Sequence, residues 1–274
     1  MPVTAATALC GIVLHPAGHT RSPAMHNAAY AALGLDALYL PFDVPPRRLR
    51  DAIAGIRGLG FRQVSVSIPH KTSILEIVDA VDATAARIGA ANTVLLDGDR
   101  LVASNTDWIG AVRALERECA LAGTRAVCLG AGGTARAVVF GLIERGAVVS
   151  VLNRSVGRAE SLARELGAQG AGPLESLASI PHDVIVNATS VGLNSDDSPV
   201  LATSIRAEAV VMDAVYAPEQ TRLLRDARAR GARVVSGRWM LVHQAVAQLE
   251  AWAGPIDGAL ATRVMAEAFG PQPA

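Results

Sequence analysis

Short apolar runs and helix-period stretches alternate along the first third of the chain. Apolar runs at residues 9–14, 38–44 and 64–68 predict strands. Between them, the stretches 22–33 and 45–57 carry apolar positions at helical spacing and predict helices. A strand, helix, strand, helix, strand order predicts a parallel α/β arrangement.

Local signals mark the ends of several of these elements. Ser22 followed by Pro23 predicts a helix start, with Ser22 as the N-cap and Pro23 at the first helical position. Gly34 is expected to end that helix. An Asp-Gly pair at residues 97–98 follows the strand-like run 92–96 and precedes another, which predicts a β-hairpin.

A glycine-rich turn follows an apolar run near the middle of the chain and leads into a helix-period stretch. The turn reads Gly-Ala-Gly-Gly-Thr-Ala over residues 130–135, and a further β-type run follows at 148–152. In a strand–turn–helix–strand unit, this spacing is typical of dinucleotide binding. Gly130 allows the tight turn, Gly132 leaves room for a pyrophosphate, and Ala135 lets the helix and the strand pack closely. A glycine turn in some other α/β protein is the alternative.

The residues after the run 148–152 indicate which dinucleotide is bound. An NAD site places an acidic residue here to bind the ribose 2′-hydroxyl, whereas a 2′-phosphate requires arginine. The chain has Asn153 and Arg154, with Arg158 one turn later and no acid. This pattern favours NADP(H). The alternative is that both arginines are ordinary solvated helix charges.

The remaining apolar runs continue the α/β pattern. They predict strands at 183–187, 209–215 and 234–235 and helices at 218–230 and 239–252. We expect a substrate-binding domain of residues 1–110 and 238–274, to which the C-terminal helices return, and a Rossmann-type domain of residues 111–237. A cleft between the two domains is the expected place for the substrate.

The composition excludes several classes of protein. With 274 residues and 51% hydrophobic residues, the chain can bury a large core. A formal net charge of zero does not favour binding to nucleic acid or to an acidic membrane. No apolar run reaches the length of a membrane span, and we expect no signal peptide. Three cysteines without metal-binding spacing indicate no metal site and a reducing, cytoplasmic location.

Two polar clusters could supply proton chemistry. Lys71 belongs to the cluster at residues 67–71, just past the end of the predicted strand 64–68, and Asp107 lies at a predicted helix start. Reduction of a ketone by hydride transfer produces an alkoxide that must take up a proton. An ammonium group can stabilise that charge and donate the proton, while a carboxylate orients it. The alternatives are a solvated lysine and an N-capping aspartate.

Ordered motifs over nearly the whole chain resemble those of the shikimate dehydrogenase family. The family's S-x-S-P motif aligns with residues 20–23, its N-V-T-V-P-x-K with 65–71, its A-x-N-T with 91–93 and its N-T-D-G with 105–108. Its glycine-turn and N-R-[ST] motifs are intact at 130–137 and 153–155. Residues 187–190, 215–216 and 237–244 also match.

This resemblance implies a role for each matching residue. It makes Lys71 and Asp107 the catalytic pair. It implies that a cyclic polyhydroxy acid is bound by Thr20, Ser22, Ser65, Ser67, Asn92, Tyr216 and Gln244. With the turn and the arginines, it gives a cofactor set of Gly130, Ala131, Gly132, Gly133, Thr134, Ala135, Asn153, Arg154, Arg158, Thr189, Ser190, Val215, Gly237 and Met240. In that picture Ser22 and Tyr216 hold the substrate carboxylate, and the protein is a monomer or a homodimer.

The activity implied is the reversible NADP-dependent reduction of 3-dehydroshikimate to shikimate, in aromatic amino acid and chorismate biosynthesis. Several positions depart from the motifs: Thr20 and Ser65 replace Ser and Asn, and Ser67 and Trp108 replace Thr and Gly. Because polar groups that bind the substrate are altered, quinate or another shikimate-like acid is the alternative substrate. We therefore expect poor shikimate oxidation that Ser65→Asn improves. A non-catalytic NADP(H) sensor is the alternative of a different class.

Overall fold

A computed structural model describes residues 3–18 and 20–270, which form two compact units. The first unit runs through Thr106 and resumes at Gln244, and the second runs from Asp107 to His243. The change of unit thus comes slightly earlier than the expected boundary at 110, and the return comes later than 237. Helix α8 (Gly237–Ala253) contributes residues to both units.

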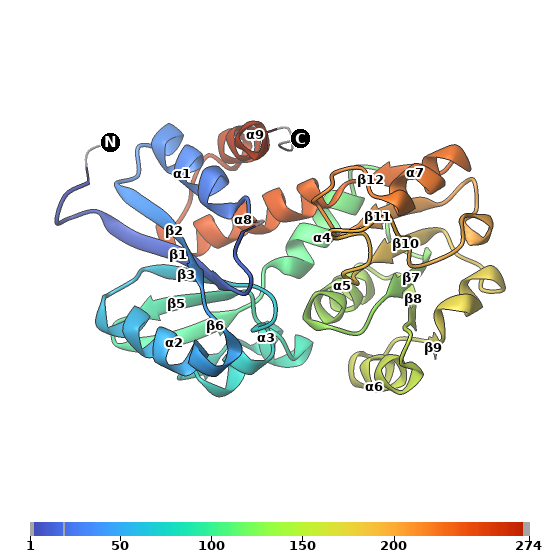
Figure 1. The fold of residues 1–274 in the computed structure, drawn as a ribbon, viewed down its shortest axis with the longest axis horizontal. Helices are drawn as coiled ribbons and strands as arrows, with labels where there is room; N and C mark the ends of the chain where they lie inside the picture. Colours follow the sequence, from blue (N-terminus) through green and yellow to red (C-terminus); the bar gives the residue numbers. More distant parts are fainter. Residues whose placement is uncertain (1–2, 19, 271–274) are drawn as a thin grey trace. The chain divides into compact units, whose positions relative to one another are not determined.

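The first unit is built on a mixed six-stranded sheet in the order β2-β1-β3-β5-β6-β4 (Figure 1). Its strands are β1 (Ala8–Leu14), β2 (Ala37–Asp43), β3 (Gln63–Val66), β4 (Ala80–Val81), β5 (Thr93–Asp97) and β6 (Arg100–Ser104). β1 pairs in parallel with β2 and β3, so the parallel prediction is confirmed for these strands. β5 runs antiparallel to β3 and to β6, so the sheet is mixed. The predicted hairpin joins β5 to β6.

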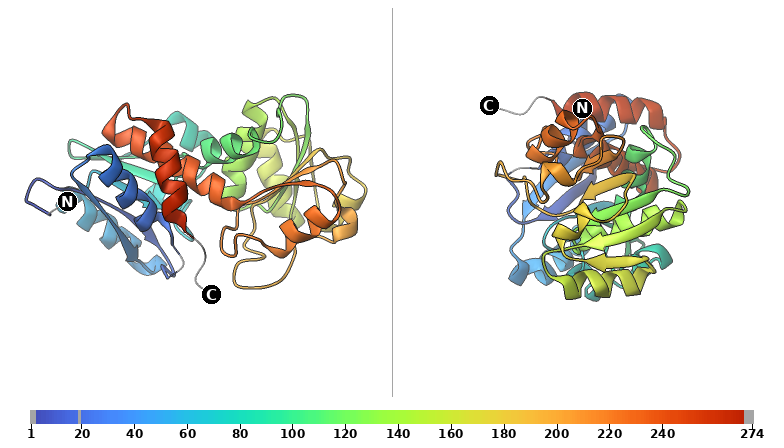
Figure 2. Two further views of the ribbon diagram at one scale, coloured as in Figure 1. Left: turned by 90° about the horizontal axis from the view of Figure 1, so that it is seen from above. Right: turned by 90° about the vertical axis from the view of Figure 1, so that its right-hand side faces the viewer.

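The helices of this unit pack around the sheet. They are α1 (Ser22–Leu33), α2 (Leu49–Gly58), α3 (Ala83–Ile88), the end of α8 and α9 (Gly258–Phe269), with short 3-10 turns at Pro46–Arg48 and Ser73–Glu76. The red α9 lies beside the blue α1 (Figure 2). α1 ends at Gly34 as predicted. The N-cap prediction is wrong, because Arg21 occupies the cap and Ser22 is already helical.

The second unit is a parallel six-stranded sheet in the order β12-β11-β10-β7-β8-β9, as expected of a Rossmann-type domain. Its strands are β7 (Arg125–Leu129), β8 (Val148–Leu152), β9 (Gly170–Gly172), β10 (Val184–Asn187), β11 (Val210–Asp213) and β12 (Arg233–Val235). The chain builds outward from β7 first on one side and then on the other. The carboxyl end of β7 is therefore the topological switch point, where such sheets bind ligands.

Helices and short turns accompany these strands. They are α4 (Asp107–Leu115), α5 (Gly133–Glu144), α6 (Val156–Leu166), α7 (Arg222–Ala229) and 3-10 turns at Leu174–Ala178 and Ala202–Ser204. Val127, Ile185 and Val211 lie in one buried cluster, because parallel strands covered on both faces are apolar throughout. Cys10 and Cys128 are buried.

Two classes of feature are absent from the described residues. None of the helices in that part of the chain combines the length and apolar character that a membrane span requires. No group of three or more His, Cys, Asp or Glu side chains there could hold a metal ion.

Candidate active site and cofactor site

The glycine turn at the carboxyl end of β7 is tightly constrained. Gly130 has φ +114°, a conformation that residues with a side chain rarely adopt. A Cβ at this position would also lie 3.1 Å from the backbone of Ala188 and 3.1 Å from Cγ2 of Thr189. Gly130 is therefore required both by its backbone conformation and by the close approach of the loop after β10.

The start of α5 has the properties of a phosphate-binding site. A Cβ built on Gly132 would meet no protein atom within 4 Å, so space is open in front of this residue. Gly132 is also the N-cap of α5 and has no side chain to cap the helix. Ala135 is fully buried, which allows the close packing expected of the third motif position. An open cradle at a helix N-terminus fits a dinucleotide pyrophosphate.

Arg154 and Arg158 lie just beyond the carboxyl end of β8 and are exposed. Among the described residues, neither forms an ion pair with a carboxylate. Asn153 donates a hydrogen bond from Nδ2 to the carbonyl of Ser155 at 3.0 Å, which shapes the turn into α6. Two exposed guanidinium groups that pair with no carboxylate fit a 2′-phosphate.

Buried polar groups organise the loops after β10 and β11. Asp213 accepts hydrogen bonds from Asn187 Nδ2 (2.9 Å), the N–H of Val215 (2.9 Å) and the hydroxyl of Thr221 (2.7 Å). Asn187 Oδ1 accepts in turn from the N–H and hydroxyl of Thr189, at 3.0 and 2.7 Å. Burial raises the pKa of Asp213 to about 6, although its three donors act in the opposite direction. This network holds Thr189 and Val215, two expected cofactor residues.

The start of α8 approaches the same loops. A Cβ on Gly237 would lie 2.6 Å from the carbonyl oxygen of Asp213 and 2.7 Å from that of Val215, so only glycine fits. Met240, one turn further, is buried, whereas Ser190 is exposed. All the expected cofactor residues lie in the second unit. Several of them come just after strands that end at the same edge of the sheet: the residues of the glycine turn, Thr189, Val215 and Gly237.

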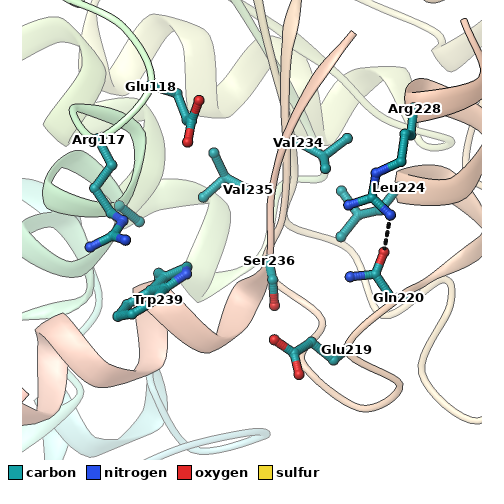
Figure 3. A pocket seen from close by; sticks show the side chains of 11 residues that line it. Arg117, Glu118, Glu219, Gln220, Leu224, Arg228, Val234, Val235, Ser236 and Trp239 are labelled. Atoms are coloured by element: carbon teal, nitrogen blue, oxygen red, sulfur yellow. Dashed lines mark hydrogen bonds between the residues drawn. The ribbon is translucent and has the colours of Figure 1, made fainter. Parts of the chain in front are cut away.

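The second unit also contains a separate pocket of about 210 Å³, beside β12 (Figure 3). The guanidinium of Arg117 lies 3.8 Å from the ring centroid of Trp239, and Arg228 donates to Gln220 at 2.9 Å. Two arginines and two glutamates line the pocket, so it has no clear charge preference. None of the expected cofactor residues is among its lining side chains.

The first unit holds most of the expected substrate residues. Ser22 is buried at the start of α1, and its N–H donates to the hydroxyl of Thr20 at 3.4 Å. Ser67 is half-buried and lies just past the end of β3. Lys71 is half-buried in the loop that follows, and its carbonyl accepts from the N–H of Ala91 at 2.8 Å.

Ser65, expected at the substrate surface, lies in the interior and is 5% exposed. Its Oγ accepts hydrogen bonds from the hydroxyl of Tyr39 (2.6 Å) and from Gln63 Nε2 (3.1 Å). It donates to Gln248 Oε1 at 2.9 Å. A hydroxyl has one donor and two acceptor sites, so these three bonds use its full capacity.

Asn92 and Gln244 are brought together directly. Asn92 Nδ2 donates to Gln244 Oε1 at 3.1 Å and to the hydroxyl of Thr106 at 3.0 Å. Asn92 Oδ1 accepts from the N–H of Thr106 at 2.7 Å and from the hydroxyl of Thr93 at 2.9 Å. The two amides therefore form one rigid group in the first unit.

The other two expected residues belong to the second unit. Asp107 is the first residue of α4 and is buried, and Tyr216 is half-buried after β11. Trp108, which replaces a glycine of the motif, packs edge-on against Phe140 with ring centroids 5.6 Å apart. This departure therefore affects the packing of α4 on α5 within the second unit.

Reasoning from the sequence missed the residues that hold the site residues in place. Gln248, Tyr39 and Thr106 contact Ser65 or Asn92, and Asp213 anchors the loops of the cofactor half. Two weak signals were present. Gln248 follows Gln244 at helical spacing, which puts both amides on one helix face. Asp213 ends an apolar strand, where a carboxylate is unusual.

Comparison with known proteins places these features in one family. Residues 12–94 match the family described as shikimate dehydrogenase substrate binding domain, and residues 113–213 match shikimate / quinate 5-dehydrogenase. The shikimate dehydrogenase (NADP(+)) of Thermococcus kodakarensis is 44% identical over 253 residues, covering 91% of this chain and 92% of the relative.

Solved structures show the same similarity. The shikimate 5-dehydrogenase of Thermus thermophilus, in complex with NADP(H) and shikimate, is 38% identical with a TM-score of 0.87, covering 95% of this chain and 99% of the other. The 5-ketofructose reductase of a Gluconobacter strain is 34% identical with a TM-score of 0.84, covering 95% and 98%.

Proposed function

Because the chain belongs to the shikimate dehydrogenase family, we propose that it catalyses the reversible NADP-dependent reduction of 3-dehydroshikimate to shikimate. The observation that carries this proposal is the buried amide pair of Asn92 and Gln244, joined at 3.1 Å. A ring hydroxyl of the substrate would exchange for the bond between the two amides, accepting from Asn92 Nδ2 and donating to Gln244 Oε1. The reaction belongs to aromatic amino acid and chorismate biosynthesis.

The second unit would bind the cofactor. The pyrophosphate would lie at the N-terminus of α5, in the open space before Gly132, and Arg154 with Arg158 would bind the 2′-phosphate. Thr189 and Val215, fixed by the network around Asp213, would border the nicotinamide half. Bound NADP⁺ supplies the hydride acceptor for oxidation of the substrate C–H bond.

Lys71 and Asp107 would move the proton. As shikimate is oxidised, its hydroxyl loses a proton while the carbon loses hydride. Lys71 would take up this proton in its neutral form and return it as an ammonium in the reverse direction, with Asp107 orienting the amine. The family motifs at 65–71 and 105–108 support these roles.

The remaining residues would recognise the substrate. Ser22, Thr20 and Tyr216 would hold the carboxylate, while Asn92, Gln244 and Ser67 would hold ring hydroxyls. Ser65 is no longer assigned to the substrate, because its three bonds go to Tyr39, Gln63 and Gln248, none of which is an expected substrate residue. A larger asparagine at this buried position would break those bonds, so we no longer expect Ser65→Asn to improve activity.

We also propose a cellular location and an oligomeric state for the enzyme. Its three cysteines are free, which fits a reducing cytoplasm. The expected assembly is a monomer or a homodimer. Size-exclusion chromatography with light scattering tests the assembly, and cell fractionation tests the location.

A substrate and cofactor panel tests the function. The compounds are shikimate and quinate, which are oxidised, and 5-ketofructose, which is reduced. Each is assayed with both nicotinamide cofactors by the nicotinamide absorbance. We expect the highest kcat/KM for shikimate with NADP⁺. Lys71→Ala should lower kcat about 10²- to 10⁴-fold while leaving NADP⁺ binding near the wild-type level. Asp107→Ala should affect the same step, so the double variant should be less than additive. Wild-type turnover in Lys71→Ala would remove lysine from the mechanism.

One observation favours a second candidate substrate. Thr20 and Ser67 depart from the family motifs at positions expected to touch the substrate, and a 34% identical relative is named for reduction of 5-ketofructose. Quinate or a related polyol would be identified by a higher kcat/KM than shikimate in the same panel. A protein that binds NADP⁺ but oxidises or reduces none of these compounds would support the sensor alternative.

A further inference from the structure

A continuous buried network links four expected substrate residues of the first unit. Besides its bonds to Tyr39 and Gln63, Ser65 donates to Gln248 Oε1 at 2.9 Å. Gln248 Nε2 donates to the carbonyl of Asn92 and to the hydroxyl of Thr93, both at 3.0 Å. The Thr93 hydroxyl then donates to Asn92 Oδ1 at 2.9 Å, within the Asn92–Gln244 pair. Tyr39 also interacts with the Ser22 side chain, at the other end of the network.

Gln248 is the centre of this network. Its side chain is 1% exposed, and both of its N–H groups and its oxygen are used in the bonds to Ser65, Asn92 and Thr93. Burying an amide stabilises a protein only if such bonds are made, and an apolar side chain of similar size would fill the space at less cost. A fully bonded polar group in a core fixes one arrangement of its neighbours. The arrangement that Gln248 fixes is the orientation of Asn92.

We propose that Gln248 is a positioning residue for substrate recognition, acting through Asn92. It holds the backbone of Asn92 directly and the side-chain oxygen of Asn92 through Thr93, and Ser65 holds Gln248 in turn. The Asn92 amide is thereby presented in one orientation together with Gln244. This inference rests on the proposed function, because it takes Asn92 to contact the substrate.

The test compares Gln248→Met with wild type in the shikimate and NADP⁺ assay. Methionine keeps the volume and removes the hydrogen bonds. We expect kcat/KM for shikimate to fall about tenfold or more, as the loss of a fixed hydrogen-bond partner predicts, with KM for NADP⁺ unchanged within about twofold. In an Asn92→Ala background the same substitution should have almost no further effect.

Gln63→Met is the matched control. Gln63 is also a 1% exposed glutamine of the first unit, but it donates to Ser65 and not to Asn92 or Thr93. We expect a smaller loss of melting temperature than in Gln248→Met, because Gln63 donates one bond where Gln248 makes three, with kcat/KM changed by less than about threefold. Equal losses of kcat/KM in the two variants would show a structural effect alone and overturn the proposal. Additive losses in the Gln248→Met, Asn92→Ala double variant would overturn it as well.

A second measurement separates this inference from the proposed function. The side-chain amide resonance of Asn92, assigned by its disappearance in Asn92→Ala, should shift and exchange faster with solvent in Gln248→Met but not in Gln63→Met. If the wild type turns over no compound in the panel, the proposed function fails and this spectrum still decides whether Gln248 holds Asn92. An unchanged Asn92 resonance would contradict the positioning role.

Discussion

Each unit of the molecule has a buried polar network. The two networks differ in whether the group at the centre can carry a charge. In the second unit the central group is the carboxyl of Asp213, which accepts three hydrogen bonds. In the first unit the centre consists of neutral groups, the hydroxyl of Ser65 and the amide of Gln248. Both networks hold loops or side chains that are expected to bind a ligand.

This difference determines what each network can do. A carboxylate only accepts, so donors converge on Asp213 and the chain of hydrogen bonds ends there. A hydroxyl or an amide accepts on one side and donates on the other, so Ser65 and Gln248 can pass an orientation on to Asn92. Only the second network can change its charge, because burial raises the pKa of Asp213 to about 6.

Removing the centre of each network should have the largest effect. Asp213→Ala leaves three buried neutral donors without an acceptor, at about 1–3 kcal/mol each, and should lower the free energy of unfolding by about 3 kcal/mol or more. Ser65→Ala leaves neutral groups unpaired and should cost about 1–3 kcal/mol. Urea unfolding at pH 4, below the raised pKa of Asp213, measures both. A larger loss in Ser65→Ala would show that the number of buried donors left without an acceptor does not rank the two networks.

Asp213→Asn should abolish the pH dependence of the second network. The pKa of Asp213 is raised from 3.8 to about 6 by burial, so the folded state binds more protons there than the unfolded state between these values. The contribution of Asp213 to stability is therefore present below pH 4 and is lost as the pH rises through 6. The difference in unfolding free energy, wild type minus variant, should fall by about 3 kcal/mol between pH 4 and pH 7. A difference that is flat with pH would contradict the raised pKa.

Arg154→Ala tests a charge that lies outside both networks. The loss of a charge-assisted bond to the 2′-phosphate is worth about 1.5–3 kcal/mol, so KM for NADP⁺ should rise roughly ten- to a hundredfold while KM for NAD⁺ changes little. Arg164→Ala is the control, because Arg164 is also exposed but lies in the last turn of α6, whereas Arg154 precedes the first turn of that helix. Equal use of NADP⁺ and NAD⁺ by the wild type would reject the preference.

Gly130→Ala compares backbone constraint with side-chain networks in the cofactor half. The new Cβ would be strained at φ +114° and crowd Ala188, so we expect about 1–3 kcal/mol of destabilisation and weaker NADP⁺ binding. Gly157→Ala is the matched control, since a Cβ added to this helical glycine would have nothing within 4 Å and alanine should stabilise the helix by up to about 1 kcal/mol. Thermal unfolding and NADP⁺ titration distinguish the two.

The cofactor half could be predicted from the sequence because its determinants are local. The strand, glycine turn and helix from β7 to α5 follow one another along the chain, and Arg154 comes directly after β8. The substrate half was less accessible. The resemblance placed Ser65 at the substrate, but Ser65 is bonded to interior partners. Its partner Gln248 lies 183 positions away.

The sequence by itself determined the α/β class, the parallel nucleotide-binding sheet, the residues of the glycine turn and the family to which the chain belongs. These follow from short-range periodicity, from glycine at a strand end and from ordered motifs, all of which are properties of neighbouring residues. Only the tertiary structure decided that β5 pairs with β3, that Asp213 is a buried acceptor and that Gln248 holds Asn92. Such features arise because folding brings distant polar groups out of water together, and their pairing depends on partners that local sequence does not specify.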